Sequence, residues 1–171
     1  MRIINLIVVH CSATREDCTL SPEDLDWLHR RRGFNGTGYH YYIRKDGTVH
    51  LTRPLERIGA HAKGFNAHSI GICYEGGLDC RGRPADTRTP EQRAALRLLV
   101  HQLLEKFPDC RVCGHRDLSP DKNGNGEIEP EEWMKACPCF DAEEEFKELV
   151  AEGTVETQSK LNYLKNEKGG K

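Results

Sequence analysis

The segment that most limits the possible folds is the run at residues 3–11, IINLIVVHC. It is almost continuously apolar and rich in β-branched residues, which favours an extended strand shielded from water. The run is interrupted by Asn5, is shorter than the ~18 apolar residues of a membrane span, and is followed by no small-residue cleavage site before Arg15. We therefore interpret residues 3–11 as a central buried strand, and neither as a membrane span nor as a signal peptide.

Helix and strand patterns alternate along the rest of the chain. Helices are expected at 21–33, which opens with Ser21-Pro22, at 89–106, which opens with Thr89-Pro90, and at 141–152, which begins at Asp141. Strands are expected in a hairpin over 39–52 around Asp46-Gly47 and at 69–75 and 110–114, and loops at 53–68 and 117–136. This order predicts one α/β domain with a central mixed β-sheet flanked by helices on both faces. We expect the domain to span residues 1–152 and residues 153–171, which lose periodicity, to form a mobile tail.

The charge balance and the cysteines narrow the functional classes. The chain has 25 Lys and Arg against 27 Asp and Glu, a net charge of −2, which argues against a basic nucleic-acid-binding face. Eight cysteines are present, but a chain of 171 residues with regular helix and strand patterns does not need a disulfide framework. We expect reduced thiols, at least one of them a metal ligand. Cys110 and Cys113 have zinc-ligand spacing, yet without a second such pair they are better interpreted as two thiols on a short strand.

Three residues far apart in the sequence are suited to bind one metal ion. His10 ends the first expected strand, His115 follows the last one, and Cys137 lies in the segment KACPCFD. Histidines at the carboxyl ends of strands open toward the edge where α/β sheets carry their sites. Two nitrogen donors and one sulfur donor suit zinc with a fourth position open to water. Spacing alone does not establish that the three residues meet.

Four motifs in order resemble a known enzyme family. They are VVHCSAT at 8–14, GYHYYIRKDGTV at 38–49, HAKGFNAHSIGICYEGG at 61–77 and KACPCFD at 135–141. Together they are similar to the zinc-dependent type 2 N-acetylmuramoyl-L-alanine amidases of the phage-lysozyme type, which are related to animal peptidoglycan recognition proteins. The resemblance covers residues 3–152. It implies hydrolysis of the amide between N-acetylmuramic acid and L-alanine in peptidoglycan.

The resemblance also assigns roles residue by residue. The family's zinc ligands correspond to His10, His115 and Cys137. Its catalytic tyrosine and lysine correspond to Tyr39 and Lys135, which would orient the attacking water or relay its proton and stabilise the carbonyl oxygen. A residue lining its substrate groove corresponds to His61.

A second metal site is predicted inside the loop at 117–136. Residues 121–132, DKNGNGEIEPEE, match the twelve-residue calcium loop of EF-hands. Its candidate ligands, at loop positions 1, 3, 5, 7, 9 and 12, are Asp121, Asn123, Asn125, Glu127, Glu129 and Glu132. Oxygen donors favour calcium over zinc. We hypothesise that this calcium ion folds an insertion, begins a short helix at 130–136 and thereby delivers Lys135 and Cys137 to the zinc site.

Two other functions fit parts of the sequence. One is a non-catalytic peptidoglycan-binding module of the same fold, against which the presence of Cys137 argues. The other is a cysteine hydrolase with Cys11 as nucleophile. The expected partner of the protein is peptidoglycan or its fragments, with no nucleic acid and no membrane span. Without a signal peptide, such a protein would be made in the cytoplasm and act on the cell wall after release or export.

Overall fold

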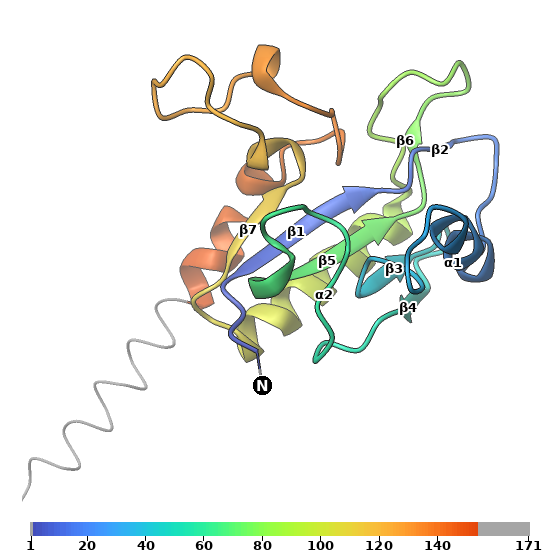
Figure 1. The fold of residues 1–171 in the computed structure, drawn as a ribbon, viewed down its shortest axis with the longest axis horizontal. Coiled ribbons are helices and arrows are strands. Elements are labelled where there is room, and N and C mark those ends of the chain that lie inside the picture. The colour runs from blue at the N-terminus through green and yellow to red at the C-terminus, as the bar shows by residue number, and fades with distance from the viewer. Residues whose placement is uncertain (1, 154–171) are drawn as a thin grey trace, which may run out of the picture.

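The computed structural model describes residues 2–153 and has a five-stranded sheet at its centre, in the order β4-β3-β5-β1-β7 (Figure 1). The strands are β1 (Leu6–Cys11), β3 (Tyr41–Ile43), β4 (Val49–Leu51), β5 (Ser69–Tyr74) and β7 (Arg111–Gly114). β1 pairs in parallel with β5 and β7, β3 pairs in parallel with β5, and only β4 in this sheet runs antiparallel to its neighbour. A separate pair, β2 (Thr14–Arg15) and β6 (Gly77–Leu78), is also parallel. The predicted mixed sheet is confirmed.

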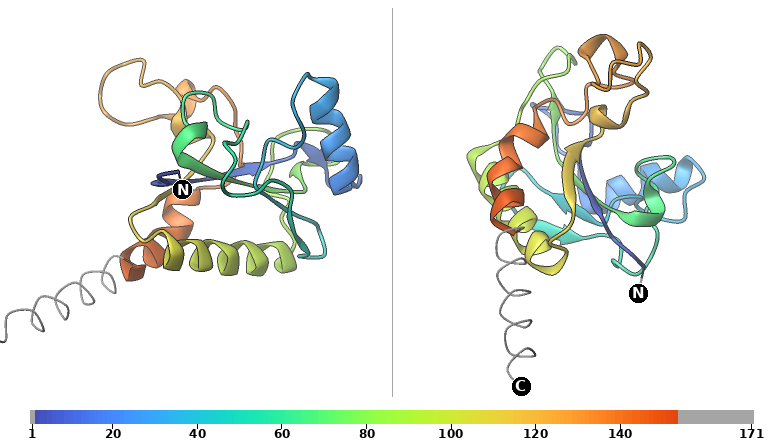
Figure 2. Two further views of the ribbon diagram at one scale, coloured as in Figure 1. Left: turned by 60° about the horizontal axis from the view of Figure 1, so that its bottom comes forward. Right: turned by 90° about the vertical axis from the view of Figure 1, so that its left-hand side faces the viewer.

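Helices cover both faces of this sheet, as predicted (Figure 2). α2 (Pro90–Lys106) and the helix over residues 142–153 lie on one face, and α1 (Pro22–Arg31) lies on the other. The sequence signals at the helix starts are present as side-chain caps. Ser21 and Thr89 each form a capping box, and the carboxylate of Asp141 accepts a hydrogen bond from the backbone N–H of Glu144.

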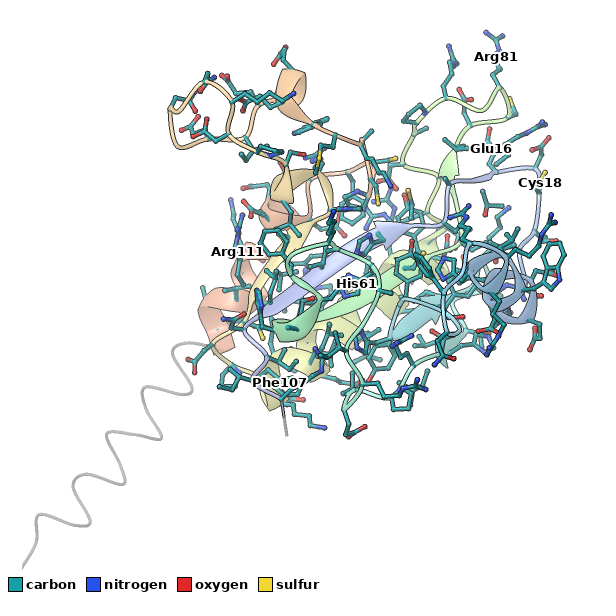
Figure 3. All side chains as sticks on the ribbon, in the orientation of Figure 1. Glu16, Cys18, His61, Arg81, Phe107 and Arg111 are labelled. Atoms are coloured by element: carbon teal, nitrogen blue, oxygen red, sulfur yellow. The ribbon has the colours of Figure 1, made fainter. Side chains whose placement is uncertain are left out.

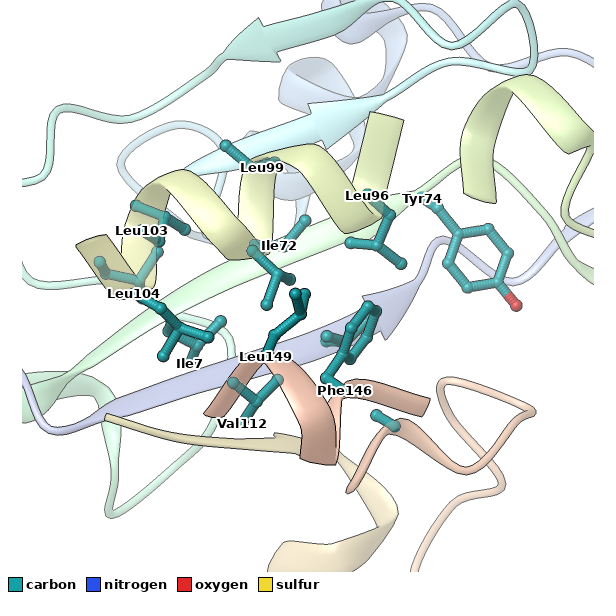
Figure 4. Packing of buried hydrophobic residues seen from close by; sticks show 14 of the residues in the cluster. Ile7, Ile72, Tyr74, Leu96, Leu99, Leu103, Leu104, Val112, Phe146 and Leu149 are labelled. Atoms are coloured by element: carbon teal, nitrogen blue, oxygen red, sulfur yellow. The ribbon is translucent and has the colours of Figure 1, made fainter. Parts of the chain in front are cut away.

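The two faces of β1 are buried against different neighbours. Ile7 and Val9 pack into the large cluster formed with α2 and the helix over 142–153, shown in Figure 4. Leu6 and Val8 belong to a second cluster on the opposite face. Because side chains alternate along a strand, His10 shares the face of Leu6 and Val8. That face is covered by α1 and by the loop at 53–68, which contains a 3₁₀ helix at Asn66–His68.

Two local expectations differ from the structure. The hairpin turn is wider than a two-residue Asp46-Gly47 turn, because β3 ends at Ile43 and β4 begins at Val49. The helix expected at 130–136 is only the 3₁₀ helix Pro130–Glu132. It stops there because Trp133 is extended and the backbone N–H of Met134 donates to Ser119 Oγ at 3.0 Å instead of continuing a helix.

The remaining predictions concern the C-terminal tail, the state of the cysteines and the absence of a membrane-spanning helix. The tail expected at 153–171 lies, after Gly153, outside the described residues. All eight cysteines are free thiols. In the part of the chain that the structure describes, no helix is both long enough and apolar enough to cross a membrane.

Candidate functional site

Strand register brings the two predicted histidine ligands together. β1 and β7 are parallel, with Val9 opposite Gly114, and the backbone N–H of His115 donates to the carbonyl of Val9 at 3.1 Å. The next residue of each chain segment is a histidine, so His10 and His115 emerge side by side at one sheet edge. Their ring centroids are 4.7 Å apart.

The third predicted ligand reaches this pair from the loop after β7. The backbone N–H of Arg116 donates to the carbonyl of Cys137 at 2.7 Å, which ties the end of the loop to its start. The Cys137 sulfur accepts the backbone N–H of Cys11 at 3.3 Å and lies 3.8 Å from Nδ1 of His10. One ligand atom from each of His10, His115 and Cys137 lies within 4.8 Å of the others. Within residues 2–153, this is the only set of three His, Cys, Asp or Glu residues that meets this condition.

The chemistry of this cluster fits zinc. Burial lowers the pKa of His10 well below the usual histidine value, and the positive charges near it act in the same direction. Burial and the charge of Lys135 lower the pKa of His115. Both imidazoles are therefore neutral at pH 7, the form in which histidine binds a metal ion. Two imidazole nitrogens and one thiolate are typical of a catalytic zinc site with three protein ligands.

The two predicted catalytic residues both line the cleft beside the cluster. The ring of Tyr39 is 5.0 Å from the ring of His10, and burial raises the pKa of its hydroxyl well above the usual value. Tyr39 is therefore a neutral hydrogen-bonding group. Lys135 is exposed, and it lines the same cleft as His10 and His115.

His61 lies behind His10. Its side chain lies over the central strands (Figure 3), the residue is 9% exposed, and its Nδ1 is 3.0 Å from Nε2 of His10. The predicted contact with substrate stays a prediction, although His61 does form part of the cleft wall.

The cleft beside the cluster has a volume of about 480 Å³. Its walls include all six residues predicted for zinc binding, catalysis and substrate contact: His10, Tyr39, His61, His115, Lys135 and Cys137. A neighbouring cavity of about 380 Å³ shares His61, His115 and Lys135 and is bounded by Phe34 and Met134. The sequence analysis did not identify these two apolar residues, because they lie in loops and belong to no motif.

The cysteine-hydrolase alternative is disfavoured by the surroundings of Cys11. Cys11 is 8% exposed, and its Sγ atom lies 3.9 Å from the Sγ atom of Cys139. Contact with the Cys137 thiol, together with burial, raises the pKa of Cys11 to about 12. A nucleophilic cysteine needs a thiolate near neutral pH, which this environment opposes.

The loop predicted to bind calcium is mostly exposed and projects beyond the sheet on the side of β7 (Figure 1), and none of residues 121–132 lines the cleft. Its oxygens accept backbone N–H groups. The carboxylate of Asp121 accepts from Gly124 and Gly126, and that of Glu132 accepts from Lys122, Asn123 and Glu129. Gly126, at the turn position of the motif, has a φ of 87°. No group of three candidate acidic ligands in this loop meets the distance condition satisfied at the zinc cluster. Calcium binding stays a prediction.

Comparison with known proteins points to one family. The sequence model described as N-acetylmuramoyl-L-alanine amidase matches residues 1–139. An endolysin of Enterobacteria phage K11 is 36% identical over 144 residues, which cover 83% of this chain and 86% of the relative.

Solved structures agree with this similarity. The endolysin N-acetylmuramoyl-L-alanine amidase LysCS from Clostridium intestinale is 31% identical, with a TM-score of 0.64, and the match covers 87% of this chain and 82% of that one. A variant of Drosophila PGRP-LB, solved in complex with tracheal cytotoxin, has a TM-score of 0.59 at 20% identity over 85% of this chain and 81% of that one. The second similarity concerns the fold alone.

The buried histidine His40 predicts a dependence of stability on pH. Burial lowers its pKa to about 4, whereas an unfolded histidine titrates near 6.5. Above pH 6.5 neither state is protonated, and between pH 6.5 and about 4 the unfolded state alone binds the proton. The free energy of unfolding of the metal-free protein should therefore fall by ~1.4 kcal/mol for each pH unit in this window from His40 alone.

Urea unfolding at pH steps from 8 to 4 measures this slope. His40→Gln should reduce the slope below pH 6.5 and leave the range between pH 7 and 8 unchanged. An equal slope in the variant and the unmodified protein would contradict a neutral buried His40.

Proposed function

Because the chain belongs to the N-acetylmuramoyl-L-alanine amidase family, we propose that it hydrolyses the amide between N-acetylmuramic acid and L-alanine in peptidoglycan, with a zinc ion held by His10, His115 and Cys137. The observation that carries the proposal is the convergence of these three donors in one cleft, in a chain of this family. A non-catalytic receptor of the same fold does not require this complete set of three ligands.

The three proposed ligands already lie close together, and both histidines are in the form that binds a metal ion. The two imidazoles are neutral, and the backbone N–H of Cys11 donates to the Cys137 sulfur at 3.3 Å. When bound, zinc would supply Lewis-acid chemistry by polarising the scissile carbonyl and lowering the pKa of water.

Tyr39 is proposed to orient the attacking water or relay its proton. Its hydroxyl lies in a buried environment that keeps the proton on Oη at neutral pH. A neutral hydroxyl can accept one hydrogen bond while donating another, which is what a proton relay requires.

Lys135 is proposed to stabilise negative charge on the carbonyl oxygen as the amide is attacked. Its positive charge is close enough to lower the pKa of both His10 and His115. Removing one such stabilising group from a hydrolase typically costs ~3–4 kcal/mol of transition-state stabilisation.

The site of action is proposed from the relatives. Similar chains are phage endolysins, and the family's activity is directed at peptidoglycan. We place this protein at the cell wall after release or export, with peptidoglycan or its fragments as partner. The apolar residues Phe34 and Met134 beside the cleft would then contact parts of the substrate away from the scissile bond.

A structural calcium ion in the loop at 121–132 is a separate part of the proposal. It is supported by the match to the twelve-residue motif and by the turn at Gly126. Since this loop precedes Lys135 and Cys137 in the chain, calcium would order the segment that carries both residues.

Replacing either of two cysteines separates the zinc mechanism from the cysteine-nucleophile alternative. Cys137→Ser should lose bound zinc and amidase activity, because a hydroxyl is a poor replacement for a thiolate ligand. Cys11→Ser should keep both. Zinc is measured by atomic emission after dialysis, and activity by mass spectrometry of stem peptides that begin with L-alanine. Zinc-independent activity that is lost in Cys11→Ser would overturn the proposal.

Replacing Tyr39 or Lys135 should impair turnover without removing the metal. We expect Tyr39→Phe to lower kcat by ~10²-fold and Lys135→Ala by ~10²–10³-fold, because each change removes a group that acts in the transition state. Bound zinc should stay within error of the unmodified protein. Lys106→Ala, a change of an exposed lysine at the end of α2 that lines neither cavity, is the matched control for charge. Unchanged kcat in Tyr39→Phe and Lys135→Ala would exclude the assigned roles.

Calcium binding is tested by calorimetric titration of the zinc-loaded protein. The unmodified protein should bind one calcium ion, and Glu132→Gln should bind it at least tenfold more weakly, since the bidentate carboxylate of position 12 is lost. If calcium orders the loop, a calcium-selective chelator should also lower zinc retention and amidase rate. Unchanged retention and rate would reject the coupling, and absence of binding heat would reject the calcium site.

A further inference from the structure

Both ring nitrogens of His61 have partners inside the protein. Nδ1 lies 3.0 Å from Nε2 of His10, and Nε2 lies 3.2 Å from the hydroxyl of Ser69, which is completely buried. The rings of His61 and His10 are nearly perpendicular, at 85°. Nε2 of His10 and Nδ1 of His61 are the atoms that face each other across this contact.

The position of His10 determines the direction of this hydrogen bond. Its Nδ1 is the nitrogen that faces the Cys137 sulfur, at 3.8 Å, so Nδ1 is the atom available to a metal ion. A neutral imidazole with a metal ion on Nδ1 carries its proton on Nε2. That N–H then donates to Nδ1 of His61, whose own proton is on Nε2 and donates to Ser69.

Two glycines provide the space in which the His61 ring lies. A Cβ atom at Gly71, in the middle of β5, would be 2.6 Å from both Cγ and Cδ2 of the ring. A Cβ atom at Gly59 would be 2.5 Å from Cδ2. Such distances essentially never occur between real atoms, so any other residue at these positions would displace the ring. Glycine inside a strand often marks a close approach of this kind.

The loop that carries His61 is held in place independently of the ring. The side-chain oxygen of Asn66 accepts the backbone N–H groups of both His61 and Ala62, each at 2.9 Å. The ring is thus held at its backbone by Asn66 and at its far nitrogen by Ser69, in space that Gly59 and Gly71 leave open.

We propose that His61 is a positioning residue: it accepts the Nε2 proton of His10 and thereby holds the Nδ1 atom of His10 toward the metal ion, in space that Gly59 and Gly71 leave open. This inference rests on the proposed zinc site. It gives His61 a role that differs from the substrate contact implied by family resemblance. An outer partner of this kind orients the ligand ring and typically contributes 10- to 100-fold to metal affinity.

Three substitutions test the role by zinc affinity, measured in competition with a chromophoric chelator. His61→Phe keeps an aromatic ring but removes the acceptor, and should weaken zinc binding 10- to 100-fold. His61→Asn can place an amide oxygen where Nδ1 lies, and should recover affinity to within about fivefold of the unmodified protein. His68→Phe is the matched control in the same loop and should leave affinity unchanged. Thermal melting of each metal-free variant identifies any general loss of folding.

The tautomers give a second measurement that needs no variant. Nitrogen-15 NMR of the zinc-loaded protein should find the proton on Nε2 in both His10 and His61. A proton on Nδ1 of His61, or full zinc affinity in a folded His61→Phe, would overturn the proposal. Should the unmodified protein bind no zinc, the proposed function fails, and the tautomers of the metal-free protein still decide whether His61 accepts from His10.

Discussion

The pairing of β1 between β5 and β7 is the constraint on which the rest of the structure depends. All six residues of β1 are buried, and its two faces pack into different clusters. A shift of one residue in this strand would move every side chain to the opposite face. His10 would then point into the apolar cluster under α2, and the hydrogen bond from His115 to Val9 would be lost. The apolar contacts that stabilise the sheet therefore also place two metal ligands.

The third ligand depends on anchoring at the ends of a long loop. The carbonyl of Cys137 accepts the backbone N–H of Arg116, and the hydroxyl of Tyr74 donates to the carbonyl of Pro138 at 2.6 Å. At the other end, the Asp117 carboxylate accepts the backbone N–H of Gly114 at 2.7 Å. The exposed middle of the loop contributes to none of these bonds. The position of the thiol is thus set by contacts with the sheet, and the projecting part of the loop is available for another role.

Gly71 contacts two buried histidines, His61 and His40, on one face of the sheet. Gly71 lacks the side chain that would displace the ring of His61, and its backbone N–H donates to Nδ1 of His40 at 3.0 Å. His40 in turn has its Nε2 3.0 Å from the carbonyl of Arg57. Unpaired buried polar groups are costly, so each of these nitrogens needs its partner. Neutral, fully partnered rings form a rigid support behind the candidate metal centre.

The sequence alone determined most of the secondary structure and which residues are candidates for the site. Alternating patterns, capping residues such as Ser21 and Thr89, and the four family motifs predicted the three helices, the strands of the central sheet, the fold class and the set His10, His115 and Cys137. These are local signals, readable over a few residues. They did not predict the short β2–β6 pair or the wider hairpin turn.

Tertiary structure decided what depends on contacts between distant residues. It determined which nitrogen of His10 faces the Cys137 sulfur and that His61 lies behind His10 and hydrogen-bonds to it. It also showed that the contact with Cys137, together with burial, disfavours a thiolate at Cys11. It shortened the helix expected at 130–136, because the hydroxyl of Ser119 accepts a hydrogen bond from the backbone N–H of Met134. His10 and His61 are 51 residues apart, and their contact follows from parallel strand register and from space at Gly71, neither of which a local pattern encodes.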